Sequence, residues 1–283
     1  RQLWLSCGAA AELARLATRM LGYACLLRTG PLPDDADGAA DGHEGADQIA
    51  ARLVVGRRLP PTSQERRLAA AIPRRHTARG PYDDRPVEPA VLASLAEAVQ
   101  ERGCWLRRVD RPGERGELIA LLSRAEEREL ADPAYRRELG DWRRRGAGAP
   151  DGFAADASLR WPAERVGDLP LRDFAGSGAA AQALDTAPRV EHDTVVVLGT
   201  DSDRPRDWVR AGRALALMLV VATDAGLVAQ PLGPVTDVPS TRALLRHDLS
   251  VLGHPQLVLR LGYGSAEPEA GRRPVRDVLT STP

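Results

Sequence analysis

The sequence contains no lysine, because all 39 of its basic residues are arginines. Arginine clusters therefore arise from composition alone, and the run at 143–145 is by itself weak evidence for a nucleic-acid module. The 39 acidic residues balance the arginines, so the formal net charge is zero. A balanced charge excludes a general attraction to nucleic acid or to an anionic membrane surface. We expect neither as a partner.

Cysteine is scarce, and the three residues present, Cys7, Cys25 and Cys104, include no CxxC pair. The five histidines show no spacing typical of zinc ligands. No window approaches the run of about 18 apolar residues that a membrane helix needs. No basic segment followed by an apolar run opens the chain. These absences predict a cytoplasmic protein with reduced thiols, no metal site and no membrane span.

The hydrophobic content is high enough for a large core. With 43% hydrophobic residues among 283, the chain can form one domain or two packed halves. Helical and strand periodicities alternate along the chain, which predicts the α+β class. The expected helices are 7–23, 63–72, one from Pro89, 114–131 and 207–226, and the expected strands are 52–56, 104–110, 194–200 and 255–264.

Two stretches lack such periodicity. Residues 28–48 are rich in Gly, Asp and Pro, which predicts an exposed connection without a catalytic role. Residues 132–190 gather Gly, Ala, Arg and Pro over a span much longer than an ordinary loop. We interpret 132–190 as a lid or irregular insertion, or alternatively as a solvated linker.

Two of the expected helices resemble each other. Gly8 and Gly22 flank an Ala-rich segment, and Gly212 and Gly226 flank another at the same spacing, 204 residues later. This interval is too long for a solenoid repeat. The pattern indicates either two related half-domains or two core helices that are alike in composition, each closed by a C-terminal glycine.

The segment "RRHTARGPYDDRPV" at 74–87 concentrates hydrogen-bond donors. Arg74, Arg75 and Arg79 surround His76 and Thr77 on a stretch that Gly and Pro interrupt, so a regular helix is excluded. Planar guanidinium groups bind phosphate through paired, charge-assisted hydrogen bonds. The segment is therefore either an anion-binding loop or a solvated loop of an arginine-rich chain.

In the order and spacing of several segments, the chain resembles the flavin-dependent nitroreductases, and specifically their tandem, Acg-type branch. These segments are "RRHTARGPYDDRPV", "DWVRAGRALALMLVVATDAGL", "QPLG" and "LGYG" followed by "RRPVRDVL". The resemblance implies an α+β nitroreductase-like fold in which two halves of one chain pack as an intramolecular pseudo-dimer, so we expect a monomer. Residues 1–72 would be the remainder of the first half, and 73–283 the second half.

FMN is the cofactor that this resemblance implies, with Arg74 in its binding loop. Arg75 would be the main contact to the FMN phosphate, while His76 and Thr77 would hold the phosphate and the ribityl chain. Arg79 would lie beside the N1 and O2 edge of the flavin ring, where positive charge stabilises the reduced, anionic flavin.

The resemblance also implies two later contacts. The family's loop beside the flavin ring, which donates to N5, would be "QPLG", although a plain helix-to-loop turn is the alternative. A late basic residue would return to the phosphate. The residues concerned are Gln230, Pro231, Leu232 and Gly233 in the loop, and Arg272 or Arg273 in the tail.

One part of the family pattern is missing. Ordinary nitroreductases carry a Pro-Ser-x-x-Asn-x-Gln-Pro-Trp segment that completes the flavin pocket from the partner subunit. Only Trp105 in "VQERGCWLRRVD" is similar to it. The chain also enters an apolar segment directly after Arg1, so we expect that it starts within a domain and that the missing segment lies upstream.

The resemblance implies an FMN-dependent oxidoreductase that transfers hydride from NAD(P)H to a nitroaromatic or quinone-like acceptor. The cofactor supplies this chemistry, so we assign no catalytic side chain. The alternative is an FMN-binding storage or sequestering protein with little or no turnover.

Overall fold

The computed structural model of the chain describes residues 1–32, 49–78, 82–143, 193–264 and 273–279. It contains helices and two separate antiparallel sheets, which confirms the α+β class. No described helix combines the length and the apolar character that crossing a membrane requires. The helices are α1 (Gln2–Met20), α2 (Ser63–Ala71), α3 (Pro89–Gln100), α4 (Glu114–Ala131), α5 (Pro133–Arg143), α7 (Pro205–Asp224), α8 (Pro234–Asp237), α9 (Pro239–Asp248) and α10 (Val275–Val278).

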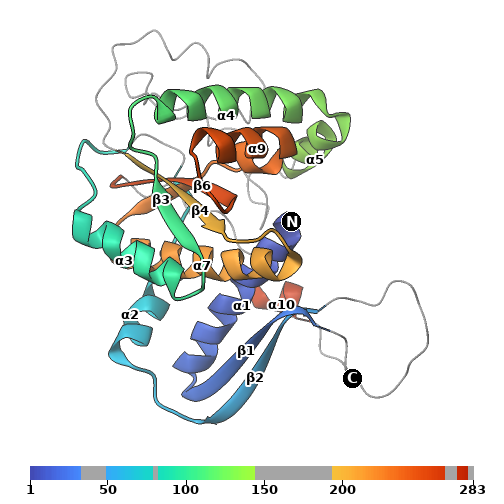
Figure 1. Cartoon of the computed structure of the whole chain (residues 1–283). Helices are drawn as coiled ribbons and strands as arrows, with labels where there is room; N and C mark the ends of the chain where they lie inside the picture. Colours follow the sequence, from blue (N-terminus) through green and yellow to red (C-terminus); the bar gives the residue numbers. More distant parts are fainter. Residues whose placement is uncertain (33–48, 79–81, 144–192, 265–272, 280–283) are drawn as a thin grey trace.

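The larger sheet has the strand order β3-β4-β6-β5 and helices on both faces (Figure 1). Val196 and Leu198 of β4 pack into a core with α3 and α7, whereas Val195 and Val197 pack into a second core with α4, α8 and α9. Burial on both faces explains why β4 is an unbroken apolar run. The strands are β1 (Tyr23–Leu32), β2 (Ile49–Arg58), β3 (Trp105–Arg108), β4 (Thr194–Thr200), β5 (Val228–Pro231) and β6 (His254–Gly262).

Helix α1 lies between α7 and the β1–β2 hairpin (Figure 1), and its crossing with α7 is a backbone contact. A Cβ atom built on Gly8 would lie 2.0 Å from the carbonyl oxygen of Val209, and one built on Gly212 would lie 1.9 Å from the carbonyl oxygen of Leu5. Each glycine thus faces the residue three positions before the other glycine. The contact is reciprocal, and it leaves no space for a side chain at either position.

The same order of elements follows both crossing helices. After α1, Gly22 adopts a φ of +83° and β1 pairs antiparallel with β2. After α7, Gly226 adopts a φ of +78° and β5 pairs antiparallel with β6. Both glycines occupy the left-handed region that ends many helices and that glycine adopts without strain.

A buried carboxylate reinforces the crossing. Glu12 of α1 is fully buried and accepts hydrogen bonds from Arg15 at 2.8 Å, from Arg102 at 2.8 Å and from Arg213 of α7 at 2.9 Å. Burial alone would raise the pKa of Glu12, but the hydrogen bond from Arg102 and the charges of Arg15 and Arg102 outweigh burial and lower it. The carboxylate therefore stays ionised and joins α1, α7 and the turn after α3.

Arg19 fastens the other end of α1. Its guanidinium donates to the carbonyl oxygens of Tyr23, Leu59 and Pro60 at 2.9, 3.0 and 3.0 Å, and to both carboxylate oxygens of Glu65 at 2.7 and 2.9 Å. The hydrogen bond from Arg19 lowers the pKa of Glu65 to about 2. One side chain thus joins α1, both ends of the hairpin and α2.

Several expected boundaries are wrong. Residues 28–32 of the expected connection belong to β1, while 33–48 lie outside the described residues. Residues 133–143 of the expected insertion form α5, and 144–192 lie outside the described residues. Helix α9 is not anticipated because it buries only Thr241 and Leu245, which leaves little apolar periodicity.

We expect Gly8→Ala to lower the free energy of unfolding by about 1–3 kcal/mol, because the new methyl group forces two helix backbones apart. Gly116→Ala in α4 is the matched control. Its Cβ would meet no atom within 4 Å, and alanine favours helix by roughly 0.5–1 kcal/mol over glycine. Urea denaturation followed by circular dichroism measures both, and a Gly8→Ala protein as stable as the parent contradicts the crossing geometry.

Candidate functional site

Residues 74–78, here called the anchor segment, run beside the outer edge of β5. Thr77 forms a parallel bridge with Ala229, and the N–H of Ala78 donates to the carbonyl oxygen of Ala229 at 3.0 Å. The other edge of β5 pairs with β6. Two motifs about 150 residues apart in the sequence, the arginine segment and "QPLG", are therefore neighbours at one edge of the sheet.

The described residues of the arginine motif differ in exposure. Arg74 is exposed, and its Nε donates to the carbonyl oxygen of Ala70 at 3.3 Å near the end of α2. Arg75, His76 and Thr77 are half-buried. The predicted ring contact, Arg79, lies outside the described residues.

The expected loop at 230–233 is partly wrong, because Gln230 and Pro231 end β5. Proline is tolerated there because it lies at the strand end, where it need not donate to the ladder. Leu232 is 5% exposed in the core, and its N–H donates to the carbonyl oxygen of Val258 at 2.8 Å. Proline has no N–H, and the N–H of Leu232 is already bonded. Among Pro231, Leu232 and Gly233, Gly233 is therefore the one residue with an N–H that makes no described hydrogen bond and could donate to a ligand.

A second group of residues contacts the anchor segment through Tyr82. The hydroxyl of Tyr82 donates to the carbonyl oxygen of Ala78 at 3.2 Å, and the guanidinium of Arg260 lies 4.0 Å from the centre of the Tyr82 ring. Arg260 in turn donates to Asp193 at 2.5 Å, and Arg115 donates to the same carboxylate at 2.7 Å. Sequence reasoning missed these residues, although an arginine within the apolar strand "PQLVLRLG" is a visible signal.

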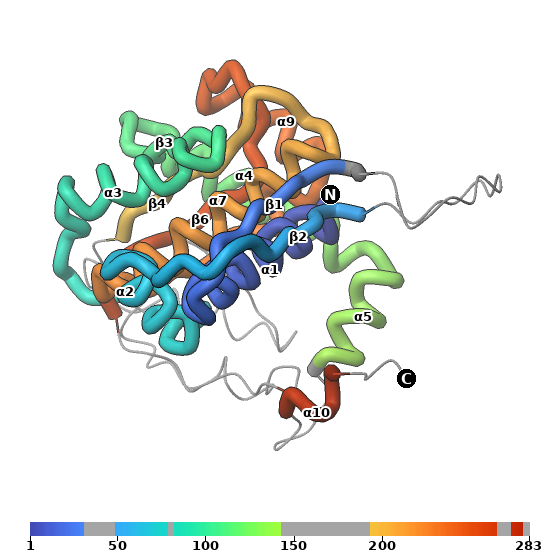
Figure 2. Tube along the Cα trace, turned by 90° about the horizontal axis from the view of Figure 1, so that it is seen from below, coloured from blue at the N-terminus to red at the C-terminus, as the bar shows by residue number. Residues whose placement is uncertain are grey.

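The predicted tail contact to the phosphate involves Arg272 or Arg273, just before α10. Arg273 is exposed and precedes α10, which lies apart from the four-stranded sheet (Figure 2). Arg272 lies outside the described residues. The return of a late arginine to a phosphate therefore stays a prediction.

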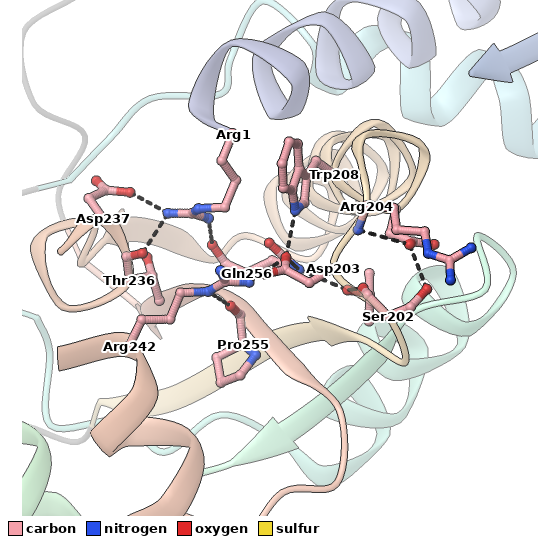
Figure 3. Close-up of polar contacts among 12 residues, drawn as sticks. Arg1, Ser202, Asp203, Arg204, Trp208, Thr236, Asp237, Arg242, Pro255 and Gln256 are labelled. Atoms are coloured by element: carbon pink, nitrogen blue, oxygen red, sulfur yellow. Dashed lines mark hydrogen bonds and ion pairs between the residues drawn. The ribbon is translucent and has the colours of Figure 1, made fainter. Parts of the chain in front are cut away.

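A further polar network fastens the start of α1 to the sheet (Figure 3). Asp203 accepts from Arg242 at 2.7 and 2.8 Å and from the indole of Trp208 at 2.5 Å. Burial would raise the pKa of Asp203, but the hydrogen bonds from Arg242 and Trp208 hold it far below its usual range. Arg1 donates to the carbonyl oxygen of Thr236 and to Asp237, both at 2.6 Å. These charges are paired within the protein and serve its structure.

The described residues also line an open groove of about 460 Å³ between α3 and β3. The strand order places β3 at the opposite edge of the sheet from β5, so this groove is separate from the anchor segment. In the ranges that the structure describes, no three His, Cys, Asp or Glu side chains are grouped to hold a metal ion. Cys104 is no candidate nucleophile, because burial raises the pKa of its thiol to about 12.

No protein-family model matches the chain. The Mycobacterium tuberculosis (H37Rv) protein named "Putative NAD(P)H nitroreductase Rv3131" is 30% identical over 267 residues, which cover 93% of this chain and 71% of that protein. "Putative NAD(P)H nitroreductase acg" of the same organism is 28% identical over 287 residues, covering 99% and 81%. A solved FMN- and NADPH-dependent nitroreductase, NfnB from a Sphingopyxis species, is 19% identical with a TM-score of 0.45, covering 76% and 99%.

The chain belongs to the NAD(P)H nitroreductase family. Its similarity to acg over nearly its whole length confirms the resemblance to the Acg-type branch. The nitroreductase-like α+β fold expected from the sequence is confirmed with it.

At pH 8 we expect iodoacetamide to leave Cys104 unmodified in the folded protein, because the thiol is 6% exposed and its pKa is raised to about 12. Cys7 and Cys25, which are half-buried, are internal controls. Peptide mass spectrometry before and after unfolding in urea reports all three thiols. Alkylation of native Cys104 at the rate of the unfolded chain contradicts this burial.

Proposed function

We propose that this protein binds FMN at the edge of β5 and passes hydride equivalents from NAD(P)H to a small acceptor such as a nitroaromatic or a quinone. The observation that carries the proposal is the contact of the anchor segment with Ala229, since it joins the two motifs to which the family resemblance assigns FMN binding. Membership of the family, through a relative named as an NAD(P)H nitroreductase, supports the reaction class.

The donors present fit the phosphate of FMN. Arg75 offers a planar fork of N–H donors, and His76 and Thr77 follow directly with further polar groups, all three half-buried. A half-buried guanidinium binds a dianion more strongly than an exposed one, because water screens the pair less. Arg75 is therefore the proposed main contact, and Arg74, which is exposed, is a weaker one.

The ring would lie towards the end of β5. The free N–H of Gly233 is the proposed donor to the flavin, in place of the wider set Pro231, Leu232 and Gly233. Arg79 remains the proposed residue at the N1 and O2 edge, and Arg272 or Arg273 the proposed late contact to the phosphate. FMN, when bound, accepts and returns the hydride, whereas the chain binds, orients and shields it.

The two-half organisation also belongs to this proposal, with residues 1–72 in the first half and 73–283 in the second. The reciprocal contact of Gly8 and Gly212 is what an approximate two-fold axis between two related helices requires. The repeated order of helix, left-handed glycine and paired strands supports it further. One chain would thus supply both sides of a site that ordinary relatives build from two subunits.

The function is tested by the visible spectrum of the purified protein reconstituted with FMN, before and after anaerobic addition of NADPH. Bound flavin that bleaches within seconds and is reoxidised by a quinone is the expected result. Bound flavin that stays yellow identifies a storage or sequestering protein instead. A protein that retains no flavin after gel filtration contradicts the proposal.

Arg75→Ala should weaken FMN binding by about 2 kcal/mol, the loss expected for a hydrogen bond to a charged group. Arg66→Ala is the matched control. Arg66 is an exposed arginine of α2, and its substitution removes the same charge from the same region of the chain. Quenching of flavin fluorescence measures both affinities. Equal losses in the two variants indicate a general charge effect and contradict the phosphate contact.

A further inference from the structure

The peptide groups of Ala78, the last residue of the anchor segment, are held on two sides. Its N–H donates to the carbonyl oxygen of Ala229 at 3.0 Å, and its carbonyl oxygen accepts from the hydroxyl of Tyr82 at 3.2 Å. The first bond fixes the segment to β5. The second fixes the orientation of the chain where it leaves β5, and it comes from a side chain that is 2% exposed.

Tyr82 is itself fixed by Arg260. The guanidinium of Arg260 lies 4.0 Å from the centre of the phenol ring, and the hydroxyl of Tyr82 lies 3.4 Å from the carbonyl oxygen of Arg260. Both side chains are 2% exposed. A cation over an aromatic ring is worth more in such a desolvated place than at the surface. The ring therefore has one position in which both its face and its hydroxyl are satisfied.

Arg260 is in turn fixed by a buried carboxylate. Its Nε donates to Asp193 at 2.5 Å, both side chains are 2% exposed, and Arg115 at the start of α4 donates to the same carboxylate at 2.7 Å. Arg260 also lies opposite Gln230 of β5 in the sheet register. A buried charge without its partner is strongly destabilising, so this arrangement has little freedom to change.

We infer that Tyr82 and Arg260 are positioning residues for the phosphate site: they fix the anchor segment in the conformation that presents Arg75 and its neighbours to FMN. This inference rests on the proposed function. Neither residue needs to touch the cofactor. A binding loop that is ordered before the ligand arrives avoids the cost of ordering it on binding, and that saving appears as affinity.

The test is a double-mutant cycle with Tyr82→Phe and Arg75→Ala, with FMN affinity measured by fluorescence quenching. Tyr82→Phe keeps the ring under Arg260 and removes the one hydroxyl, so we expect a folded protein that binds FMN about 2- to 10-fold more weakly. In the Arg75→Ala background the same change should have little further effect, because Tyr82 acts through the segment that carries Arg75.

Tyr23→Phe is the matched control, since Tyr23 lies on β1 under another guanidinium, that of Arg58, 5.7 Å from its ring centre. It should leave FMN affinity unchanged. Undiminished affinity in Tyr82→Phe overturns the inference. Independent, additive losses in the two backgrounds also overturn it, because they indicate that Tyr82 does not act through Arg75.

Amide hydrogen exchange without any ligand separates this inference from the proposed function. Exchange at Ala78 should be faster in Tyr82→Phe than in the parent and unchanged in Tyr23→Phe. A parent protein that binds no FMN refutes the proposed function, whatever the exchange shows. A parent that binds FMN, together with unchanged exchange at Ala78 in Tyr82→Phe, refutes the positioning role alone.

Discussion

The contact on which the rest of the structure depends is the crossing of α1 and α7, where two helix backbones meet at Gly8 and Gly212. Backbones this close leave no room for side chains, so the two helices have one relative position instead of several. Glu12 then closes the same interface with three guanidinium groups. Because α7 also covers one face of the sheet, this crossing sets where α1, the hairpin and α2 lie relative to β5 and the anchor segment.

In this chain without lysine, arginines hold elements of the fold together. The guanidinium of Arg19 bonds three carbonyl oxygens and both oxygens of Glu65, and Arg242 bonds two carboxylate oxygens of Asp203 and the carbonyl oxygen of Pro255. The compact ammonium group of lysine has three donors and no planar fork, so it cannot make these contacts. Much of the arginine in this chain therefore joins elements of the fold, and arginine density alone is a poor guide to its binding site.

How far the sequence predicts this structure depends on burial. The bounds of β4 and α4 agree with the expected 194–200 and 114–131, because their apolar patterns are strong and end at clear turn residues. Helix α9 and the whole of strand β5 are missing from the prediction, since α9 buries few residues and β5 is a short strand that ends in a proline typical of a turn. The anchor segment was found from its donors, but its pairing with Ala229 is a long-range contact that no local pattern encodes. Tyr82 was part of the quoted motif, yet its role depends on Arg260, which lies far away in the sequence.

The pairing of Thr77 with Ala229 also bears on how the molecule folds. It joins residues about 150 positions apart, so forming it closes a long loop and costs conformational entropy of the chain. Contacts of such high sequence separation form slowly compared with helices and hairpins. The cofactor site that we propose therefore depends on a contact that local structure alone cannot supply, and a flavin that needs this pairing binds only chains in which the pairing has formed. Retention of the yellow colour would then report that this long-range pairing has formed, as well as binding.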